Sequence, residues 1–315
     1  MSSLVYHAPQ TVDETIDLLE KYGSEARILA GGSDLVVELR EGRVGARALV
    51  GIEALDELRR VEIDGGNLVI GAATTFSTIA AHPLVRAVAA ALAESAEAVG
   101  SVQIRNRGTM GGNLATSSPA GDTFSPLLAH EALVCIAGRG GDRTVSVQEY
   151  VAARQGAAAR QSALGAKDAP AAPTAEPWVN GLIKSVVVPV PPEPIVRSVF
   201  VRLGRRNALV ISRINLALLV AYRDGSAVRV RMALGAVGPG PILVDGVADV
   251  LLREWDDGSA RRIALLAAGA VAASLGDRPS ARYKVRAVES LVYEALERCG
   301  AAVWDTESTF DTDRR

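Results

Sequence analysis

Apolar positions along the first half of the chain switch between helical and strand spacing, and turn or capping residues mark each switch. A helix is predicted over 12–22, where Thr11 is a suitable N-cap with Glu14 three residues later and Gly23 a stop signal. Shorter apolar runs of strand character follow at regular intervals along the chain. The predicted strands are 3–8, 27–30, 46–52, 61–63, 68–71, a buried strand ending near 137, and 143–147.

A long helical pattern separates these strands into two groups. It covers 76–98, is broken at Pro83, and carries an alanine-rich face suited to close packing. A short helical turn is expected at 55–58, and Asp64-Gly65-Gly66-Asn67 is a strong hairpin signal. The pattern therefore predicts an α+β unit over 1–150 with two lobes, at about 1–54 and 55–150.

The pattern changes after residue 150. Ala, Gln, Gly and Pro dominate 151–177, with almost no large apolar residue after Leu164, which predicts an expanded loop or linker, or a segment that orders on a partner. A second, smaller α+β unit of three strands with helices on one face is expected over 178–303, before a polar tail at 304–315. Its predicted strands and helices are 183–188, 200–203, 216–222, 227–234, 259–274 and 281–299.

The composition of the 315 residues is that of an ordinary globular protein, with 49% hydrophobic and 22% charged residues. A net charge of −2 gives no electrostatic reason to expect nucleic acid or an anionic membrane as a partner. No apolar run reaches membrane-spanning length and no basic-then-apolar leader is found, so a cytoplasmic location is expected.

Cysteines and histidines do not form a recognisable metal-binding pattern. Cys135 and Cys299 belong to no Cys-x-x-Cys pair, so we expect reduced thiols and neither a zinc site nor an iron–sulfur cluster. His7, His82 and His130 lack metal-ligand spacing and are expected to be structural or surface residues.

The segment 105–122 carries the clearest chemical signal. Its glycines, Gly108, Gly111 and Gly112, are expected to adopt positive φ and to let main-chain N–H groups approach a ligand. Hydroxyl and amide side chains are interleaved with them, and a Pro119–Gly121 turn would present Asp122. Consecutive amides of this kind suit a phosphate or pyrophosphate, and a carboxylate suits the hydroxyls of a sugar or ribityl chain. An ordinary loop is the alternative.

A second glycine turn lies near the N-terminus. Residues 27–37 read as a buried strand, the pair Gly31-Gly32, and another apolar segment. Backbone amides in such a turn can face a phosphate, although a Gly-Gly pair between apolar runs is also common in hairpins.

Together the two segments resemble those of the FAD-binding medium subunits of the molybdenum hydroxylases, the family of carbon monoxide, xanthine and nicotinate dehydrogenases. The first matching motif is Ala30-Gly31-Gly32-Ser33-Asp34-Leu35, and the second is 108–116 continuing to Pro119 and Asp122. The resemblance extends over roughly residues 1–300. It implies an α+β fold with a two-lobed FAD-binding domain followed by a smaller C-terminal flavoprotein domain, with FAD in the cleft between the lobes.

The resemblance also implies roles for individual residues. The backbone of the first motif would hold the pyrophosphate, polar residues of the second would complete the phosphate and ribityl cradle, and Asp122 would bind flavin-side hydroxyls. Ile104 and Ile183 would pack on the cofactor, Ile183 from the second domain. Arg202 lies near a lysine of many relatives, with a surface arginine as the alternative. The cofactor-binding residues expected are Ala30, Gly31, Gly32, Ser33, Asp34, Leu35, Ile104, Thr109, Gly111, Gly112, Asn113, Thr116, Asp122, Ile183 and Arg202.

No arrangement of Ser or Cys with His and Asp, and no pair of carboxylates, indicates substrate chemistry on this chain, so no catalytic residue is assigned. The resemblance implies an oxidoreductase subunit within a heterohexamer, a dimer of heterotrimers. A large subunit would oxidise substrate at molybdopterin. A small subunit with two [2Fe-2S] clusters would pass electrons to this FAD, which delivers them to NAD⁺, a quinone or another acceptor.

Two alternatives remain. A self-contained flavin reductase resembling UDP-N-acetylenolpyruvoylglucosamine reductase has broadly similar glycine loops, but the Pro119 to Asp122 extension and the 203–212 sequence resemble the medium subunits more closely. A scaffold protein that has lost its cofactor is the other alternative, and the intact glycine pairs argue against it.

Overall fold

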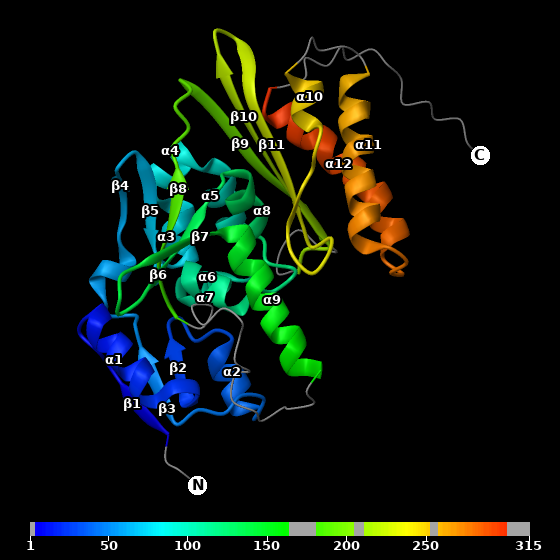
Figure 1. Cartoon of the computed structure of the whole chain (residues 1–315). Helices are drawn as coiled ribbons and strands as arrows, with labels where there is room; N and C mark the ends of the chain where they lie inside the picture. The colour runs from blue at the N-terminus through cyan, green and yellow to red at the C-terminus, as the bar shows by residue number, and fades with distance from the viewer. Residues whose placement is uncertain (1–3, 164–180, 205–210, 253–257, 301–315) are drawn as a thin grey trace.

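The computed structural model describes residues 4–163, 181–204, 211–252 and 258–300, and these residues form three β-sheets with flanking helices (Figure 1). The first sheet is parallel, with the strand order β1-β3-β2. Helices in the connections cross over between its strands, as parallel pairing requires. Its elements are β1 (Val5–His7), α1 (Val12–Tyr22), β2 (Ala26–Leu29), α2 (Leu35–Arg40) and β3 (Ala48–Gly51).

The start of α1 follows the sequence prediction. The Thr11 Oγ1 accepts a hydrogen bond from the Glu14 amide at 3.1 Å, and the Glu14 carboxylate accepts one from the Gln10 amide at 2.7 Å. Val12 and Thr15 point to the protein interior. The predicted N-cap is therefore confirmed.

The second sheet is the centre of the molecule and has the strand order β4-β5-β8-β6-β7. Its strands are β4 (Val61–Asp64), β5 (Asn67–Gly71), β6 (Leu133–Ala137), β7 (Arg143–Ser146) and β8 (Leu182–Pro189). The helices around it are short: η2 (Asp56–Arg59), α3 (Phe76–Ala81), α4 (Pro83–Val88), α5 (Ala90–Ala98), α6 (Val102–Arg107), α7 (Met110–Thr116) and α8 (Phe124–Ala129).

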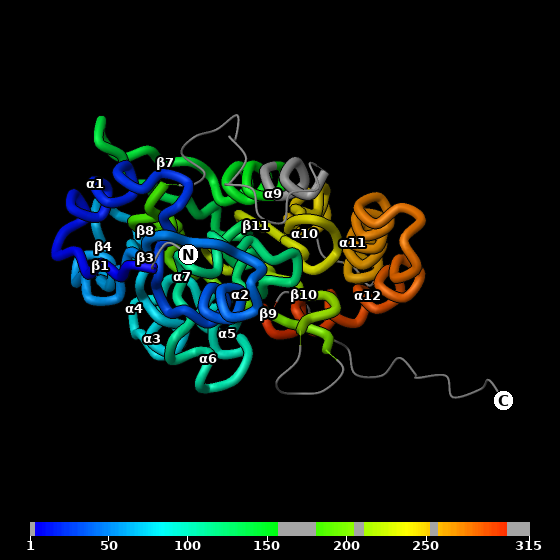
Figure 2. The backbone as a smooth tube through the Cα atoms, turned by 90° about the horizontal axis from the view of Figure 1, so that it is seen from below, coloured from blue at the N-terminus to red at the C-terminus, as the bar shows by residue number. Residues whose placement is uncertain are grey.

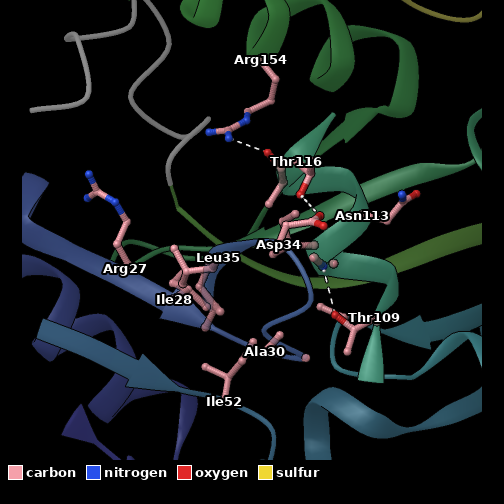
Figure 3. Close-up of a pocket in the computed structure, with 18 of the residues that line it drawn as sticks. Arg27, Ile28, Ala30, Asp34, Leu35, Ile52, Thr109, Asn113, Thr116 and Arg154 are labelled. Carbon is pink, nitrogen blue, oxygen red and sulfur yellow. Dashed lines mark hydrogen bonds between the residues drawn. The ribbon is translucent and has the colours of Figure 1, made fainter. Parts of the chain in front are cut away.

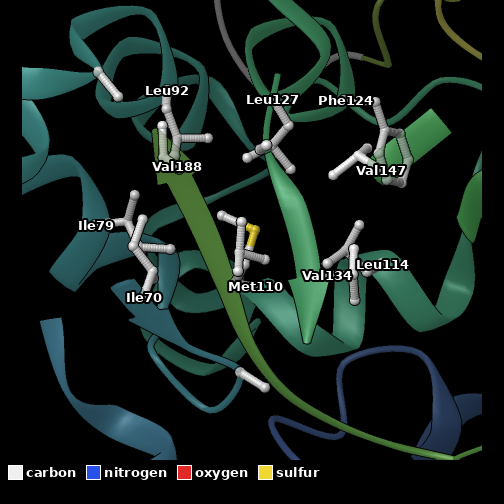
Figure 4. Close-up of a cluster of buried hydrophobic side chains, with 14 of the residues drawn as sticks. Ile70, Ile79, Leu92, Met110, Leu114, Phe124, Leu127, Val134, Val147 and Val188 are labelled. Carbon is white, nitrogen blue, oxygen red and sulfur yellow. The ribbon is translucent and has the colours of Figure 1, made fainter. Parts of the chain in front are cut away.

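The largest apolar cluster of the N-terminal half fills the space between this sheet and its helices (Figure 4). Val188 of β8 and Val134 of β6 face Met110 and Leu114 of α7, all of them fully buried. Met110 and Leu114 are four residues apart and so share one face of the helix. This face packs α7 against the central sheet, so the opposite face of α7 is directed away from the sheet.

The placement of β8 corrects one prediction. Residues 183–188 were expected to open the second α+β unit, yet β8 pairs antiparallel with β5 and β6 in the central sheet. The β-branched run identified a strand correctly. It could not identify the sheet, because its partners lie 45 or more positions away in sequence, at Val134 and Leu68 for example.

The segment after β7 corrects another prediction. Helix α9 (Val147–Ala163) occupies the first part of the expected 151–177 linker, and the remainder of that stretch lies outside the described residues. Tyr150 and Val151 are buried and fix the start of the helix to the core. Alanine has the highest helix propensity of all residues, so an alanine-rich stretch needs few apolar anchors to be helical. The division of the chain into domains at 150 and 178 stays a prediction.

The third sheet is antiparallel and has the order β12-β11-β10-β9, which adds a strand to the predicted three. Helices α11 and α12 cover one face, and their apolar side chains form the C-terminal core. Figure 2, seen from below, shows this helix pair at the end of the molecule away from α1. The elements are β9 (Ile195–Leu203), β10 (Ile214–Arg223), β11 (Ser226–Gly235), β12 (Ile242–Leu243), α10 (Val247–Leu251), α11 (Ser259–Leu275) and α12 (Ala281–Arg298).

Helix α8 joins the central and C-terminal parts. Leu128 and Ala129 pack on Ala217 and Leu219 of β10, on the sheet face opposite α11 and α12. The α+β architecture expected from the sequence is thus confirmed. None of the helices in the described residues combines the length and apolar character that crossing a membrane requires.

Candidate functional site

A cavity of about 1570 Å³ lies between the first sheet and the central sheet. It is larger than the 300–1000 Å³ of a drug-sized ligand site and can take a long ligand. Both glycine segments line it, one from the β2–α2 turn and one from α7 (Figure 3). Of the fifteen cofactor-binding residues expected from the sequence, fourteen line this cavity, and Arg202 does not.

The two glycine segments touch through their backbones. A Cβ added to Gly31 would stand 1.7 Å from the carbonyl oxygen of Arg107, so glycine is required for the approach. The Arg107 Nε also donates to the Gly31 carbonyl at 3.3 Å. A third contact comes from Thr116, whose hydroxyl donates to the Asp34 carboxylate at 3.0 Å. Segments more than 70 residues apart in sequence therefore form one continuous wall.

The first segment offers unpaired backbone donors. Among the described residues, the amides of Gly31, Gly32 and Ser33 have no hydrogen-bond acceptor in the protein. Gly32 adopts φ +72°, a conformation that favours glycine and turns successive N–H groups toward one side. Since buried or ligand-facing amides are nearly always paired, three consecutive unpaired donors at a cavity wall suit an anionic oxygen cluster.

The second segment differs from its prediction. Instead of a loop, 105–122 contains the end of α6 and all of α7, and Gly108, Gly111 and Gly112 all have negative or helical φ. The Met110 and Gly111 amides donate to the carbonyls of Thr74 and Ala72, and the Gly112 amide donates to Thr109 Oγ1. The expected run of exposed amides is therefore wrong for this segment.

Close packing explains these glycines instead. A Cβ on Gly111 would stand 2.6 Å from the Cβ of Ala72 and 2.9 Å from its carbonyl oxygen. Thr109, Gly112, Asn113 and Thr116 lie at i, i+3, i+4 and i+7, opposite the Met110 and Leu114 face, and they line the cavity. Helix α7 thus supplies side-chain hydroxyl and amide groups in place of backbone donors.

Asp122 and Arg202 form a buried ion pair at the edge of the cavity. The Arg202 Nη1 lies 3.2 Å from Asp122 Oδ2, and the Asn215 Nδ2 donates to Asp122 Oδ1 at 3.0 Å. Burial raises the pKa of Asp122, and the guanidinium of Arg202 opposes that rise. The surface-arginine alternative for Arg202 is wrong, because only 17% of its side chain is exposed.

Aliphatic side chains line other parts of the cavity. Ile104 is 40% exposed, whereas Ile183 is 5% exposed on β8. Because β8 belongs to the central sheet, the expectation that Ile183 reaches the cavity from the second domain is wrong. Among the described residues after β8, it is Ile211 that lines the cavity.

Sequence reasoning missed several lining residues. Arg27 of β2 and Arg154 and Tyr150 of α9 all line the cavity. Burial lowers the pKa of Arg27 and raises the pKa of Tyr150 to about 12. A signal existed for α9, since Tyr150, Val151 and Arg154 have helical spacing, but the alanine-rich composition was read as a loop. Within the described residues no cluster of His, Cys, Asp and Glu could hold a metal ion.

The residues present fit the FAD expected from the sequence. The cavity is long enough for a dinucleotide, unpaired amides at 31–33 suit its pyrophosphate, and hydroxyl groups of α7 suit a polyol chain. Gly31 and Gly111 let the cavity walls pack closely on Arg107 and Ala72, where a methyl group would clash. Aliphatic side chains such as Ile104 and Ile183 suit a ring.

Known families and structures agree with this geometry. A family model described as "FAD binding domain in molybdopterin dehydrogenase" matches residues 2–166, and one described as "CO dehydrogenase flavoprotein C-terminal domain" matches residues 200–299. The nicotinate dehydrogenase FAD-subunit of Eubacterium barkeri is 32% identical over 244 residues, which cover 77% of each chain. The carbon monoxide dehydrogenase medium chain of Afipia carboxidovorans is 26% identical over 300 residues, covering 95% of this chain and 97% of the relative.

A solved structure agrees as well. Carbon monoxide dehydrogenase from Hydrogenophaga pseudoflava, in a form that lacks the Mo-pyranopterin moiety of its molybdenum cofactor, contains a chain that superimposes with a TM-score of 0.78 at 26% identity. The match covers 95% of this chain and 97% of the other.

Proposed function

The chain belongs to the family of FAD-binding subunits of molybdopterin dehydrogenases, and on that premise we propose that it relays electrons between partner iron–sulfur clusters and an acceptor. The single observation that supports this best is the cavity in which two glycine segments meet through their backbones. The cavity suits one extended dinucleotide.

The residues proposed to hold FAD divide by chemistry. The unpaired amides of Gly31, Gly32 and Ser33 bind the pyrophosphate oxygens. Asn113 and Thr116 direct polar groups of α7 at the cavity, and the bond from Thr116 to Asp34 keeps the two walls together. When bound, FAD supplies a ring that exchanges either single electrons or a hydride, and so connects one-electron and two-electron partners.

The protein's own contribution is binding, orientation and exclusion of water. Ile183 presents a rigid apolar surface, because β8 is held on both sides by neighbouring strands. Asp122 is engaged by Arg202 and Asn215, so we assign it to fixing the wall of the cavity. The alternative role for Asp122 is to bind flavin-side hydroxyls.

Substrate oxidation is proposed to occur on another polypeptide. The relatives carry names such as FAD-subunit and medium chain, and the related carbon monoxide dehydrogenase is described by its molybdenum cofactor, of which the solved form lacks the Mo-pyranopterin moiety. We propose a large molybdopterin subunit and a small [2Fe-2S] subunit as partners, assembled as a dimer of heterotrimers in the cytoplasm. NAD⁺, a quinone or another acceptor receives the electrons.

The test is co-expression of the chain with candidate molybdopterin and iron–sulfur subunits, followed by spectroscopy. Stoichiometric FAD is expected in the purified chain, and a reducing substrate of the molybdopterin subunit should bleach the flavin absorbance in the complex but not in the isolated chain. A colourless chain that binds no added FAD contradicts the proposal. NADPH turnover of an enolpyruvyl sugar by the isolated chain would indicate the self-contained reductase instead.

A further inference from the structure

We propose that Arg154 of α9 is a cofactor-binding residue that holds the pyrophosphate of the dinucleotide from the side opposite the first glycine turn. This inference rests on the proposed function, because it assigns a residue to the ligand of that same cavity.

Helix α9 is positioned to deliver this side chain. Tyr150 and Val151 are buried in the central core and set the rotation of the helix. Arg154 lies four residues after Tyr150, on the same helix face, and both residues line the cavity. Gln155 lies four residues after Val151, and its side-chain amide donates to the carbonyl of Pro239 in the C-terminal half. Contacts on two sides therefore hold this turn of α9 in place.

The guanidinium of Arg154 lies at the C-terminal end of α7. Its Nη2 donates to the backbone carbonyl of Ala115, in the last turn of α7. The next residue, Thr116, makes the bond to Asp34 that joins the walls. Figure 3 shows Arg154 descending from α9 toward this junction, across the pocket from Ile28 and Leu35. A guanidinium has five N–H donors in a planar fork, so it can bind a backbone carbonyl and an anion at the same time.

The cavity lining carries four acidic side chains and four arginines, Arg27, Arg139, Arg143 and Arg154. Glu20, Asp34, Glu38 and Asp122 all line the cavity, and a pyrophosphate brings further negative charge. Glu20 is paired with Arg139, and Asp122 is paired with Arg202. Asp34 and Glu38 lie beside the first glycine turn. Neither of these two arginine pairs neutralises their negative charges.

Arginine suits this task because its planar fork can bind two phosphate oxygens at once. Arg27 also lines the cavity, yet its Nη1 donates to the carbonyls of Ser24 and Ala26 beside its own strand. Arg154 in contrast comes from an element outside both glycine segments. Because α9 carries the Arg154 guanidinium, the helix and the bound dinucleotide stabilise one another.

The experiment measures dissociation constants of the full chain for FAD, ADP and riboflavin, at low and high ionic strength, by fluorescence titration. Arg154→Gln keeps hydrogen-bond donors but removes the charge, and Arg154→Lys keeps the charge without the fork. Arg261→Gln serves as the matched control, since Arg261 is exposed on α11 and is not part of the cavity lining. Thermal unfolding of each apoprotein checks that the fold is kept.

We expect Arg154→Gln to weaken both FAD and ADP by about 10- to 100-fold, the size of a charge-assisted hydrogen bond, and to reduce the salt dependence of binding. Riboflavin, which has no phosphate, should bind as to the wild type, and Arg154→Lys should recover part of the loss. Unchanged FAD and ADP affinity in Arg154→Gln would overturn the inference, and so would an equal loss for riboflavin. A wild-type chain that fails to bind FAD at all would overturn the proposed function itself.

Discussion

Gly31 lies so close to Arg107 that a methyl group on its α-carbon would stand 1.7 Å from the Arg107 carbonyl oxygen. A hydrogen bond joins the same two residues, because Arg107 Nε donates to the carbonyl oxygen of Gly31. This junction connects the first sheet to the central part of the molecule at the inner wall of the cavity. Its integrity therefore decides both stability and the shape of the site.

Substitution Gly31→Ala should lower the free energy of unfolding by about 1–3 kcal/mol or more, because backbone must move to admit the methyl group. FAD should be lost as well, since the amides of Gly31–Ser33 would shift with the turn. Thermal unfolding and the ratio of flavin to protein absorbance measure the two effects. Gly45→Ala is the control: no atom lies within 4 Å of its added Cβ. Equal behaviour of the two variants would contradict the close packing described for Gly31.

The two glycines of α7 should behave differently from each other. Gly111→Ala must displace Ala72, whose Cβ and carbonyl would lie 2.6 and 2.9 Å from the new carbon, so the fold should be destabilised. Gly112→Val meets Thr109 Oγ1 at 3.0 Å as its nearest atom and fills cavity space. We expect the valine variant to fold near the wild-type melting temperature but to be purified without flavin colour. A valine variant that retains its flavin would remove Gly112 from the binding wall.

Much of the fold could be predicted from local sequence. The capping pair Thr11 and Glu14 marks the start of α1 in the local sequence, and a bond from the Val12 amide to the Glu57 carboxylate adds a tertiary contact there. The hairpin at 64–67 joins β4 and β5 as expected, because glycines at 65 and 66 adopt the positive φ that the turn needs. Signals of this kind depend on neighbours within a few residues, which the sequence displays directly.

The predictions that failed concern features determined by contacts between residues far apart in sequence. Gly111 looked like a loop residue, but it is a glycine because a helix packs against Ala72, nearly 40 positions earlier. The pairing of β8 with β5 and β6 follows from the assembled sheet and not from its own apolar run. Arg154 escaped notice because α9 was read as a linker. The candidate site was recognised from its two glycine motifs, while its cations and its ion pair required the tertiary structure.

The ion pair of Arg202 with Asp122 gives a third prediction. Arg202→Met removes the guanidinium beside the buried Asp122 carboxylate, so the free energy of unfolding at neutral pH should fall by about 3 kcal/mol. The double variant Arg202→Met/Asp122→Asn carries no buried charge and should be more stable than Arg202→Met alone. Chemical denaturation of the single and double variants measures the difference.

The same pair predicts a pH effect. Without Arg202 the pKa of Asp122 should rise further above its unfolded value, so the deficit of Arg202→Met should shrink as the pH falls and Asp122 takes up a proton. Arg43→Met is the control, because the Arg43–Glu41 pair is more than half exposed on both sides and such pairs contribute little. A deficit that grows at low pH would contradict the assignment.

His130 supplies the last prediction. It follows α8 and is 4% exposed, and neither ring nitrogen has a hydrogen-bond partner among the described residues. Burial, together with the charges of Arg229 and Arg231, lowers the pKa of His130 from 6.5 to about 4. Both arginines pair with Glu131, so their charges stay beside the ring.

The sign of the effect on stability follows from that pKa. The unfolded chain takes up a proton at His130 near pH 6.5, whereas the folded protein takes it up only near pH 4. Stability that is present above pH 6.5 is therefore lost as the pH falls from 6.5 to 4. The loss attributable to this residue should reach roughly 3 kcal/mol. His130→Phe cannot be protonated and should flatten the pH dependence of the unfolding free energy between pH 6.5 and 4. His7→Phe, at a ring bonded to the Tyr22 hydroxyl, should leave that slope in place. If the unfolding free energies of the wild type and of His130→Phe depended equally on pH in this range, His130 would be protonated as easily in the folded protein as in the unfolded chain. That result would contradict the lowered pKa of His130.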